Sequence, residues 1–209
     1  MLNNMLKQYL HPADDIMISK PKILAFAGST RIDSFNKKLV KIAATGATEA
    51  GADVTVIDLR DFPMPLYDGD LEQQEGLPPN ARKLKDIMLE HQGFLISSPE
   101  YNSSISAVLK NTIDWASRQS EGETSLACFK GKVAGIMSTS TGVLGGLRGL
   151  VHVRSILGNI GVIVIPDQVA VVKANEAFNS DGTLKDKNQE EQIKMIGASV
   201  TKMLSKINN

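Results

Sequence analysis

The sequence contains a single cysteine among its 209 residues, Cys128. One thiol cannot form a disulfide within the chain, so we expect a reducing compartment, the cytoplasm. No apolar run reaches the ~20 residues of a membrane-spanning helix, and the first 21 residues lack the apolar core of a signal peptide. These absences disfavour secreted and membrane-embedded classes of protein.

Neither sign of charge is in excess, because 23 Lys and Arg residues balance 23 Asp and Glu residues. This balance gives no reason to expect a nucleic acid or an anionic membrane as a partner. The three histidines have neither metal-ligand spacing nor evident Ser and Asp partners, so we predict no metal site.

Three phosphate or nucleophile motifs are also missing. There is no G-x-x-x-x-G-K-[ST] loop for a nucleoside triphosphate and no G-x-G-x-x-G dinucleotide fingerprint after a strand. A G-x-S-x-G elbow, typical of hydrolases on α/β folds, is absent as well.

Five short apolar runs alternate with helical patterns along most of the chain. The runs span residues 22–27, 54–58, 93–97, 133–137 and 162–165, and the helical patterns span 35–50, 80–91, 106–118, 147–158 and 187–206. Such alternation, with nearly continuous apolar strands, predicts an α/β fold with a parallel sheet covered on both faces. We expect one doubly wound domain of three layers over residues 22–209, preceded by an extension of residues 1–21.

The loop of residues 28–36 follows the first strand and combines a glycine, small hydroxyls and one arginine. Ser34 is a plausible N-cap, which leaves the first N–H groups of the following helix and its positive dipole end facing the loop. The Arg31 guanidinium can donate a bidentate hydrogen bond to phosphate oxygens. Ser29, Thr30 and Asn36 can donate further hydrogen bonds. The loop is therefore either a cradle for a phosphate monoester or an ordinary turn that only caps its helix.

Two further loops leave the same edge of the predicted sheet, where ligands of doubly wound folds bind. Residues 98–104 combine Pro99, which fixes a turn, with Tyr101, whose flat ring has a polar tip. Residues 138–146 are rich in hydroxyls and glycine, which allow a close approach of the backbone to a ligand. Without a ligand, these segments would be a helix-capping turn and a flexible linker.

The motifs G-S-T-R-x-x-S-x-N, P-E-Y-N-x-S and L-K-N-x-I-D-W-A-S-R occur in this order. Together they resemble the NADPH-dependent FMN reductases, which are flavodoxin-like flavoproteins that include quinone, azo-dye and chromate reductases. The resemblance covers residues 22–185 and implies the strand order 2-1-3-4-5. The family pattern usually has Gly at Ser103 and Pro-Gly at Ser106 and Ala107, so we expect a shifted loop geometry on the acceptor side.

The resemblance implies an FMN site built from all three loops. The first loop, with Ser29, Arg31, Ser34 and Asn36, would hold the phosphate, the second would border the isoalloxazine ring, and the third would lie behind it. The predicted FMN-binding residues are Ser29, Thr30, Arg31, Ser34, Phe35, Asn36, Pro99, Glu100, Tyr101, Asn102, Ser138, Thr139, Ser140, Thr141 and Gly142.

The implied activity is hydride transfer from NADPH or NADH to FMN, followed by transfer of two electrons to a small acceptor. The acceptor would be a quinone, an azo compound, a metal oxyanion or free flavin, and no catalytic side chain is predicted. A flavodoxin-type electron carrier is the main alternative, but carriers of that kind tend to be strongly acidic. The family commonly forms dimers or tetramers, and Trp115 with the face of its helix is a candidate contact.

Overall fold

The structure is a computed structural model that describes residues 20–207. The expected N-terminal extension therefore lies outside the described residues, apart from Lys20 and Pro21. Within the described part of the chain, no helix combines the length and the apolar composition needed to cross a bilayer.

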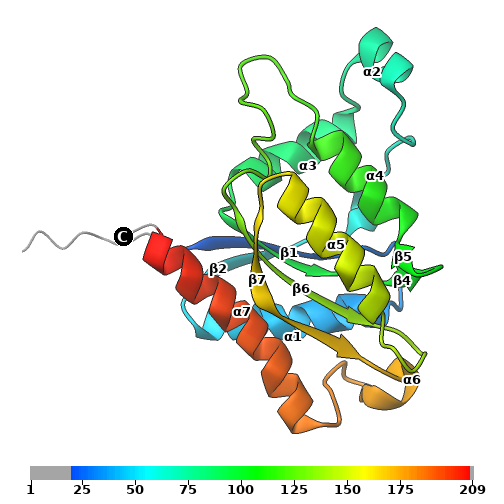
Figure 1. Cartoon of the computed structure of the whole chain (residues 1–209), viewed down its shortest axis with the longest axis vertical. Helices are drawn as coiled ribbons and strands as arrows, with labels where there is room; N and C mark the ends of the chain where they lie inside the picture. The colour runs from blue at the N-terminus through cyan, green and yellow to red at the C-terminus, as the bar shows by residue number, and fades with distance from the viewer. Residues whose placement is uncertain (1–19, 208–209) are drawn as a thin grey trace, which may run out of the picture.

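Five parallel strands form the central sheet in the order β2-β1-β3-β6-β7 (Figure 1). Their bounds are β1 Lys22–Ala27, β2 Asp53–Val56, β3 Gly93–Ser97, β6 Val133–Thr139 and β7 Ile163–Val171. Numbered along the chain, the strands of this sheet have the predicted order 2-1-3-4-5. The expected three-layer, flavodoxin-like architecture is thus confirmed.

Helices cover both faces of the sheet (Figure 1). One face carries α1 (Phe35–Glu49) and α7 (Lys187–Ile207), and the other carries α3 (Pro79–Leu89), α4 (Ala107–Ala116) and α5 (Leu147–Asn159). Successive residues of a strand point to opposite faces, so Ile23 and Ala25 join one core while Leu24 and Phe26 join the other. Because both faces of the sheet are buried, most residues of these strands are apolar.

Two glycines allow α1 and α7 to cross in backbone contact. A Cβ atom built on Gly46 would lie 2.1 Å from the Lys194 carbonyl oxygen, and one built on Gly197 would lie 2.0 Å from the Ala43 carbonyl oxygen. No larger residue fits either position without moving a helix. This contact brings α7 over the sheet and closes the core beneath it.

The structure corrects the sequence prediction at the third loop. Residues 138–146 were expected to be a loop, but β6 continues through Ser138 and Thr139, which pair with Ala170 and Val171 of β7. The register of β6 and β7 shifts between Ala134 and Ile136, which lets β7 run past Pro166 and extend the ladder. The third loop therefore begins at Ser140.

Other short elements were not predicted. Residues 98–104 contain most of a hairpin of β4 (Glu100–Tyr101) and β5 (Ser104–Ile105). The long connection after β2 contains a 3₁₀ helix (Leu59–Asp61) and α2 (Gly69–Glu75), and α6 (Ala174–Ala177) follows β7. Elements of two to seven residues are too short to show a period in the sequence.

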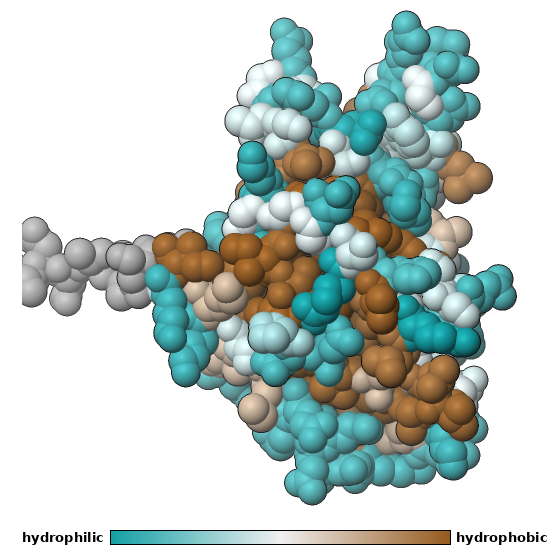
Figure 2. Space-filling view, viewed as in Figure 1, coloured by the Kyte–Doolittle hydropathy of each residue, from teal (hydrophilic) through white to brown (hydrophobic). Residues whose placement is uncertain are grey.

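Large exposed apolar side chains gather around the start of α5. Val143 is 77% exposed and Val151 is 61% exposed, with Leu144 and Leu147 between them in the chain. Figure 2 shows the corresponding brown surface over the start of α5 and the loop before it. A patch of this kind on a folded domain commonly marks an interaction surface.

Candidate functional site

The three segments that leave the carboxyl edge of the sheet are joined by hydrogen bonds. The Gly28 N–H donates to the Ser97 carbonyl oxygen over 2.9 Å, and the Ser98 N–H donates to the Met137 carbonyl oxygen over 2.9 Å. The predicted convergence of these segments at one rim is therefore observed.

Asn36 ties the first segment to the other two from a buried position. Its side-chain oxygen accepts from the Ser97 hydroxyl over 2.8 Å and from the Thr139 N–H over 3.1 Å, while its Nδ2 donates to the Thr139 carbonyl oxygen over 2.9 Å. The Oδ1 and the Nδ2 of Asn36 are thus both used in hydrogen bonds that hold the segments together. A phosphate contact by Asn36 stays a prediction, and only its second amide hydrogen is free to make one.

Ser106 joins the start of α4 to the first loop, although sequence reasoning did not select it. Its hydroxyl donates to the Gly28 carbonyl oxygen over 2.6 Å and accepts from the Leu109 N–H over 3.2 Å, which caps α4. The family pattern has proline here, which has no hydroxyl. A serine three residues before a buried leucine of a helical pattern is a capping signal that could have identified it.

A cavity of about 420 Å³ lies between the first loop and the start of α4, and Tyr101 also lines it. Its volume is in the range of small-molecule sites. Its other lining residues are Gly28, Ser29, Thr30, Arg31, Ser106, Ala107 and Val108. Of these, Gly28, Ser106, Ala107 and Val108 were not among the predicted site residues.

The cavity wall carries a cation and hydroxyls that have few other partners. Within residues 20–207, the exposed Arg31 guanidinium forms no salt bridge, and the Ser29 hydroxyl oxygen accepts only from the Arg31 N–H, over 3.3 Å. Ser34 occupies the N-cap position of α1, as predicted, but its side chain makes no capping hydrogen bond, and it lines a neighbouring cavity rather than this one. The hydroxyls and the first N–H groups of α1 can therefore donate to an anion.

Glu100 turns its carboxylate toward α5. The carboxylate accepts from Arg148 Nε over 2.8 Å and from the Gly149 N–H over 3.1 Å. Burial raises the pKa of Glu100, but the hydrogen bonds from Arg148 and Gly149 outweigh it and hold the pKa below its ordinary value. Because the carboxylate is engaged there, the backbone of Glu100 is the part left to border a ligand.

The third segment divides into a buried and an exposed part. The hydroxyls of Ser138 and Thr139 donate to the carbonyl oxygens of Gly145 and Val171, so both are occupied within the fold. Thr141 and Gly142 are exposed, and Ser140 is half-buried. Of the predicted residues in this segment, only Ser140, Thr141 and Gly142 reach the surface, and backbone hydrogen bonds hold Ser140 to Val171 and Ala174, and Gly142 to Lys173.

The remaining predicted residues lie at the rim or beneath it. Phe35 packs against Phe178 with ring centroids 5.4 Å apart and supports the loop from the core. Pro99 is buried, whereas Thr30 and Asn102 are exposed. Tyr101 is 52% exposed, which leaves part of its ring open to a ligand.

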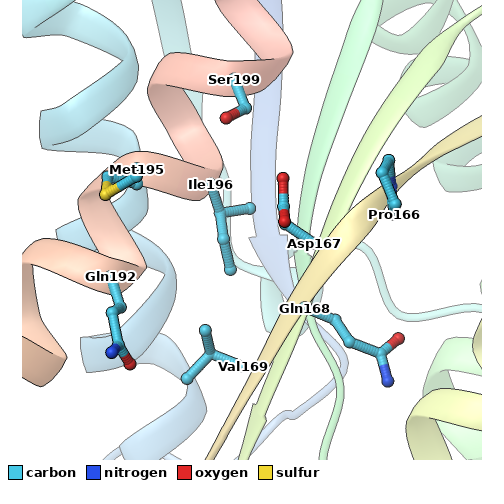
Figure 3. Close-up of a pocket in the computed structure, with 8 residues that line it drawn as sticks. All are labelled: Pro166, Asp167, Gln168, Val169, Gln192, Met195, Ile196 and Ser199. Carbon is cyan, nitrogen blue, oxygen red and sulfur yellow. The ribbon is translucent and has the colours of Figure 1, made fainter.

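A second cavity, of about 450 Å³, lies between β7 and α7 and is lined by no residue of the three segments. Figure 3 shows Met195 and Ser199 of α7 on one side and Asp167 and Gln168 of β7 on the other. Asp167 is its one ionisable lining residue among the described residues. It offers no cation to a phosphate, so the cavity at Arg31 is the better candidate site.

The β4–β5 hairpin contains a strained turn. Its two central residues, Asn102 and Ser103, have φ angles of 51° and 66°, as a type I′ turn requires. Asparagine adopts such angles far more readily than serine does. Ser103 stands where the family pattern usually has glycine. The turn therefore forms with backbone strain at Ser103.

We expect Ser103→Gly to raise the free energy of unfolding by about 1 kcal/mol, because glycine adopts a positive φ without the steric penalty of a side chain. Urea unfolding followed by circular dichroism measures this change. Asn102→Gly is the matched control and should gain less. An equal gain in the control, or a loss in Ser103→Gly, would contradict the assignment of strain to Ser103.

The family model described as NADPH-dependent FMN reductase matches residues 21–176. A probable NADPH:quinone oxidoreductase 2 from Oryza sativa subsp. japonica is 34% identical over 177 residues, which cover 83% of each chain. The quinone reductase of Escherichia coli K12 is 34% identical over 176 residues, which cover 81% of this chain and 88% of that one.

Solved structures show the same architecture. A flavoenzyme NAD(P)H:(acceptor) oxidoreductase from Paracoccus denitrificans has a TM-score of 0.71 at 28% identity, over 87% of this chain and 96% of that chain. A flavodoxin from the domain Archaea has a TM-score of 0.57 at 11% identity, over 87% of this chain and 97% of that chain, and shares the fold alone.

Proposed function

This chain belongs to the NADPH-dependent FMN reductase family, and from that premise we propose that it reduces a small two-electron acceptor of the quinone class. It is an oxidoreductase whose cofactor is FMN and whose electron donor is NADPH or NADH. The names of its relatives support a quinone as acceptor. The main structural observation that supports the proposal is the cavity lined by Arg31, which could hold the phosphate of FMN.

The chemistry of this cavity fits the phosphate end of FMN. A phosphate monoester requires hydrogen-bond donors and positive charge, and the cavity offers the Arg31 guanidinium with the hydroxyls of Ser29 and Thr30. Helix α1 begins at Phe35, directly after the loop, and its dipole adds to the attraction. We assign the phosphate to this loop and the ring to the neighbouring hairpin and to residues 140–142.

FMN, when bound, accepts a hydride from NAD(P)H and delivers two electrons to the acceptor. The residues of this chain bind and orient the participants. Arg31, Ser29 and Thr30 anchor the phosphate, and the half-exposed Tyr101 ring offers a flat surface at the rim. We assign no nucleophile and no general base, because the hydride transfer itself needs neither.

Anaerobic addition of NADPH to the FMN-loaded protein tests the proposal. We expect the visible absorption of the bound flavin to disappear and then to return when a quinone is added. A flavin that keeps its absorption with both NADPH and NADH would instead indicate an electron carrier of the flavodoxin type. A protein that takes up no FMN would contradict the proposal.

The cytoplasm remains our proposed location, on the ground of the single thiol. Cys128 is buried, and this burial raises its pKa to about 11, so it stays a protonated thiol at neutral pH. Cell fractionation tests this proposal, and recovery of the protein in an oxidising compartment would contradict it.

We also propose that the protein is a homodimer or homotetramer, with a different contact from the one that the sequence suggested. Trp115 cannot form that contact, because it is fully buried and its Nε1 donates to the Pro65 carbonyl oxygen over 2.9 Å. The apolar surface around Val143, Leu147 and Val151 is available instead.

Light scattering should give two or four times the mass of one chain, which is 22.6 kDa. Val151→Asp should lower the measured mass, since a carboxylate in an apolar interface is costly to bury. The exposed Met195→Asp is the matched control on α7 and should leave the mass unchanged. A wild-type protein with the mass of one chain would contradict the proposal.

A further inference from the structure

The β4–β5 hairpin is too small to hold its own position. Each strand has two residues, and the hairpin makes only the pairs Glu100 with Ile105 and Tyr101 with Ser104. Isolated two-stranded hairpins are at best marginally stable in water. Contacts with the rest of the protein must therefore fix where the hairpin lies and where it presents Tyr101.

Helix α5 supplies these contacts. Arg148 Nε and the Gly149 N–H donate to the Glu100 carboxylate over 2.8 Å and 3.1 Å. One turn further on, His152 Nδ1 lies 2.9 Å from the Ser104 hydroxyl oxygen. The first turns of α5 therefore hold both strands of the hairpin.

The backbone of α5 also approaches the hairpin closely. A Cβ atom built on Gly149 would lie 3.4 Å from Glu100 Cβ and 3.4 Å from the Ser104 carbonyl oxygen. The Glu100 side chain is 8% exposed, whereas that of Arg148 is 57% exposed. The carboxylate is thus buried at this contact, and Arg148 covers it from the solvent side.

We propose that Arg148 is a positioning residue for the flavin reaction, because through Glu100 it fixes the β4–β5 hairpin and the place of Tyr101 at the rim of the site. The inference rests on the proposed function, since it assumes that flavin lies beside this hairpin. Tyr101 lines the cavity of Arg31, whereas Arg148 itself does not line it. Arg148 therefore acts on the reaction through the hairpin.

A displaced hairpin should affect turnover more than FMN affinity. Transfer between two bound molecules depends steeply on their relative position, and a displacement of about 1 Å can cost on the order of 100-fold in rate. The Arg148 side chain donates to Glu100 and not to Arg31, Ser29 or Thr30, so the phosphate anchor would stay intact. The inference thus predicts a loss in kcat with a nearly unchanged Kd for FMN.

The experiment compares Arg148→Gln, Glu100→Gln and the double variant in the FMN-loaded protein. We expect each single variant to lower kcat with NADPH on the order of tenfold, to shift the visible circular dichroism of the flavin, and to change the FMN Kd by less than about threefold. The double variant should be no worse than the singles, because all three remove the same contact. Arg148→Lys, which keeps one charged donor, should recover part of kcat.

Arg154→Gln is the matched control on the same helix, because Arg154 donates to Gln168 and to carbonyl oxygens of β7 rather than to the hairpin. It should keep the wild-type kcat and flavin spectrum. An Arg148→Gln protein that matches the wild type, or that loses no more kcat than Arg154→Gln, would overturn the inference while leaving the proposed function in place. If the wild-type protein bound no FMN, the proposed function would fail, and the inference would fail with it.

Discussion

Replacing Arg31 by alanine is expected to weaken FMN binding by about 10- to 100-fold. A hydrogen bond to a charged group contributes about 1.5–3 kcal/mol, and ~1.4 kcal/mol corresponds to a factor of ten in Kd. Arg31 is exposed, lines the candidate cavity and has no salt-bridge partner within the described residues. Its full donor capacity is thus available to a phosphate.

Titration of the flavin-free protein with FMN, followed by quenching of flavin fluorescence, measures this loss. The free energy of unfolding without FMN should change by less than about 0.5 kcal/mol, as is usual for an exposed side chain without partners. The loss of affinity would therefore be separate from any loss of the fold.

Lys38→Ala is the matched control for charge. Lys38 lies in the first turn of α1, near the same loop, but it contacts the Phe35 ring and lines other cavities. Its removal should change the FMN Kd by less than about threefold, because a charge that does not touch the phosphate attracts it only over a distance, and salt screens that attraction. Equal losses in the two variants, or no loss in Arg31→Ala, would remove the phosphate from this loop.

The fold could be predicted from the sequence because its strands are buried on both faces. Residues 22–27 and 93–97 were predicted as strands, and they are β1 and β3. The end of β6 could not be predicted in the same way. Ser138 and Thr139 are polar, and they are in a strand only because Ala170 and Val171 of β7 pair with them beyond the bulge.

The location of the site could be predicted, but the role of each side chain could not. The sequence showed which segments leave the carboxyl edge of the sheet, and the hydrogen bonds of Asn36 confirm that these segments meet. It did not show that the Glu100 carboxylate turns toward Arg148, since the partner is 48 residues away in the chain. The Arg148 side chain is 57% exposed, as is usual for a surface residue, and its contact with Glu100 is seen only in the structure.

A buried lysine of α3, Lys85, supports the loop between α4 and β6. The Lys85 side chain is 1% exposed, and its Nζ lies 2.6 Å from Glu123 Oε2. Arg82 Nη1 donates to the same carboxylate over 2.8 Å, and the Ser120 N–H donates to it over 3.2 Å. Glu123 is therefore the carboxylate that pairs with the buried Lys85 side chain.

Glu123→Gln is expected to lower the free energy of unfolding by about 3 kcal/mol at pH 7, because removal of one partner leaves an uncompensated buried charge. Asp114→Asn is the matched control, since Asp114 pairs with Lys110 over 2.8 Å on an exposed helix face. It should cost less than about 0.5 kcal/mol, as is typical of surface pairs. Urea unfolding of the two variants measures both values.

The same carboxylate should make the stability of the wild-type protein depend on acid. Burial raises the pKa of Glu123, but hydrogen bonds from Lys85, Arg82 and Ser120 outweigh it and lower the pKa from 4.5 to about 2. A pKa that is lower in the folded state stabilises the protein above pH 4.5, and this stabilisation is lost as the pH falls from 4.5 toward 2. Glutamine does not titrate, so the stability difference between wild type and Glu123→Gln should shrink over that range. A difference that stays constant from pH 7 to pH 3, or one below about 1 kcal/mol at pH 7, would show that Glu123 does not compensate Lys85.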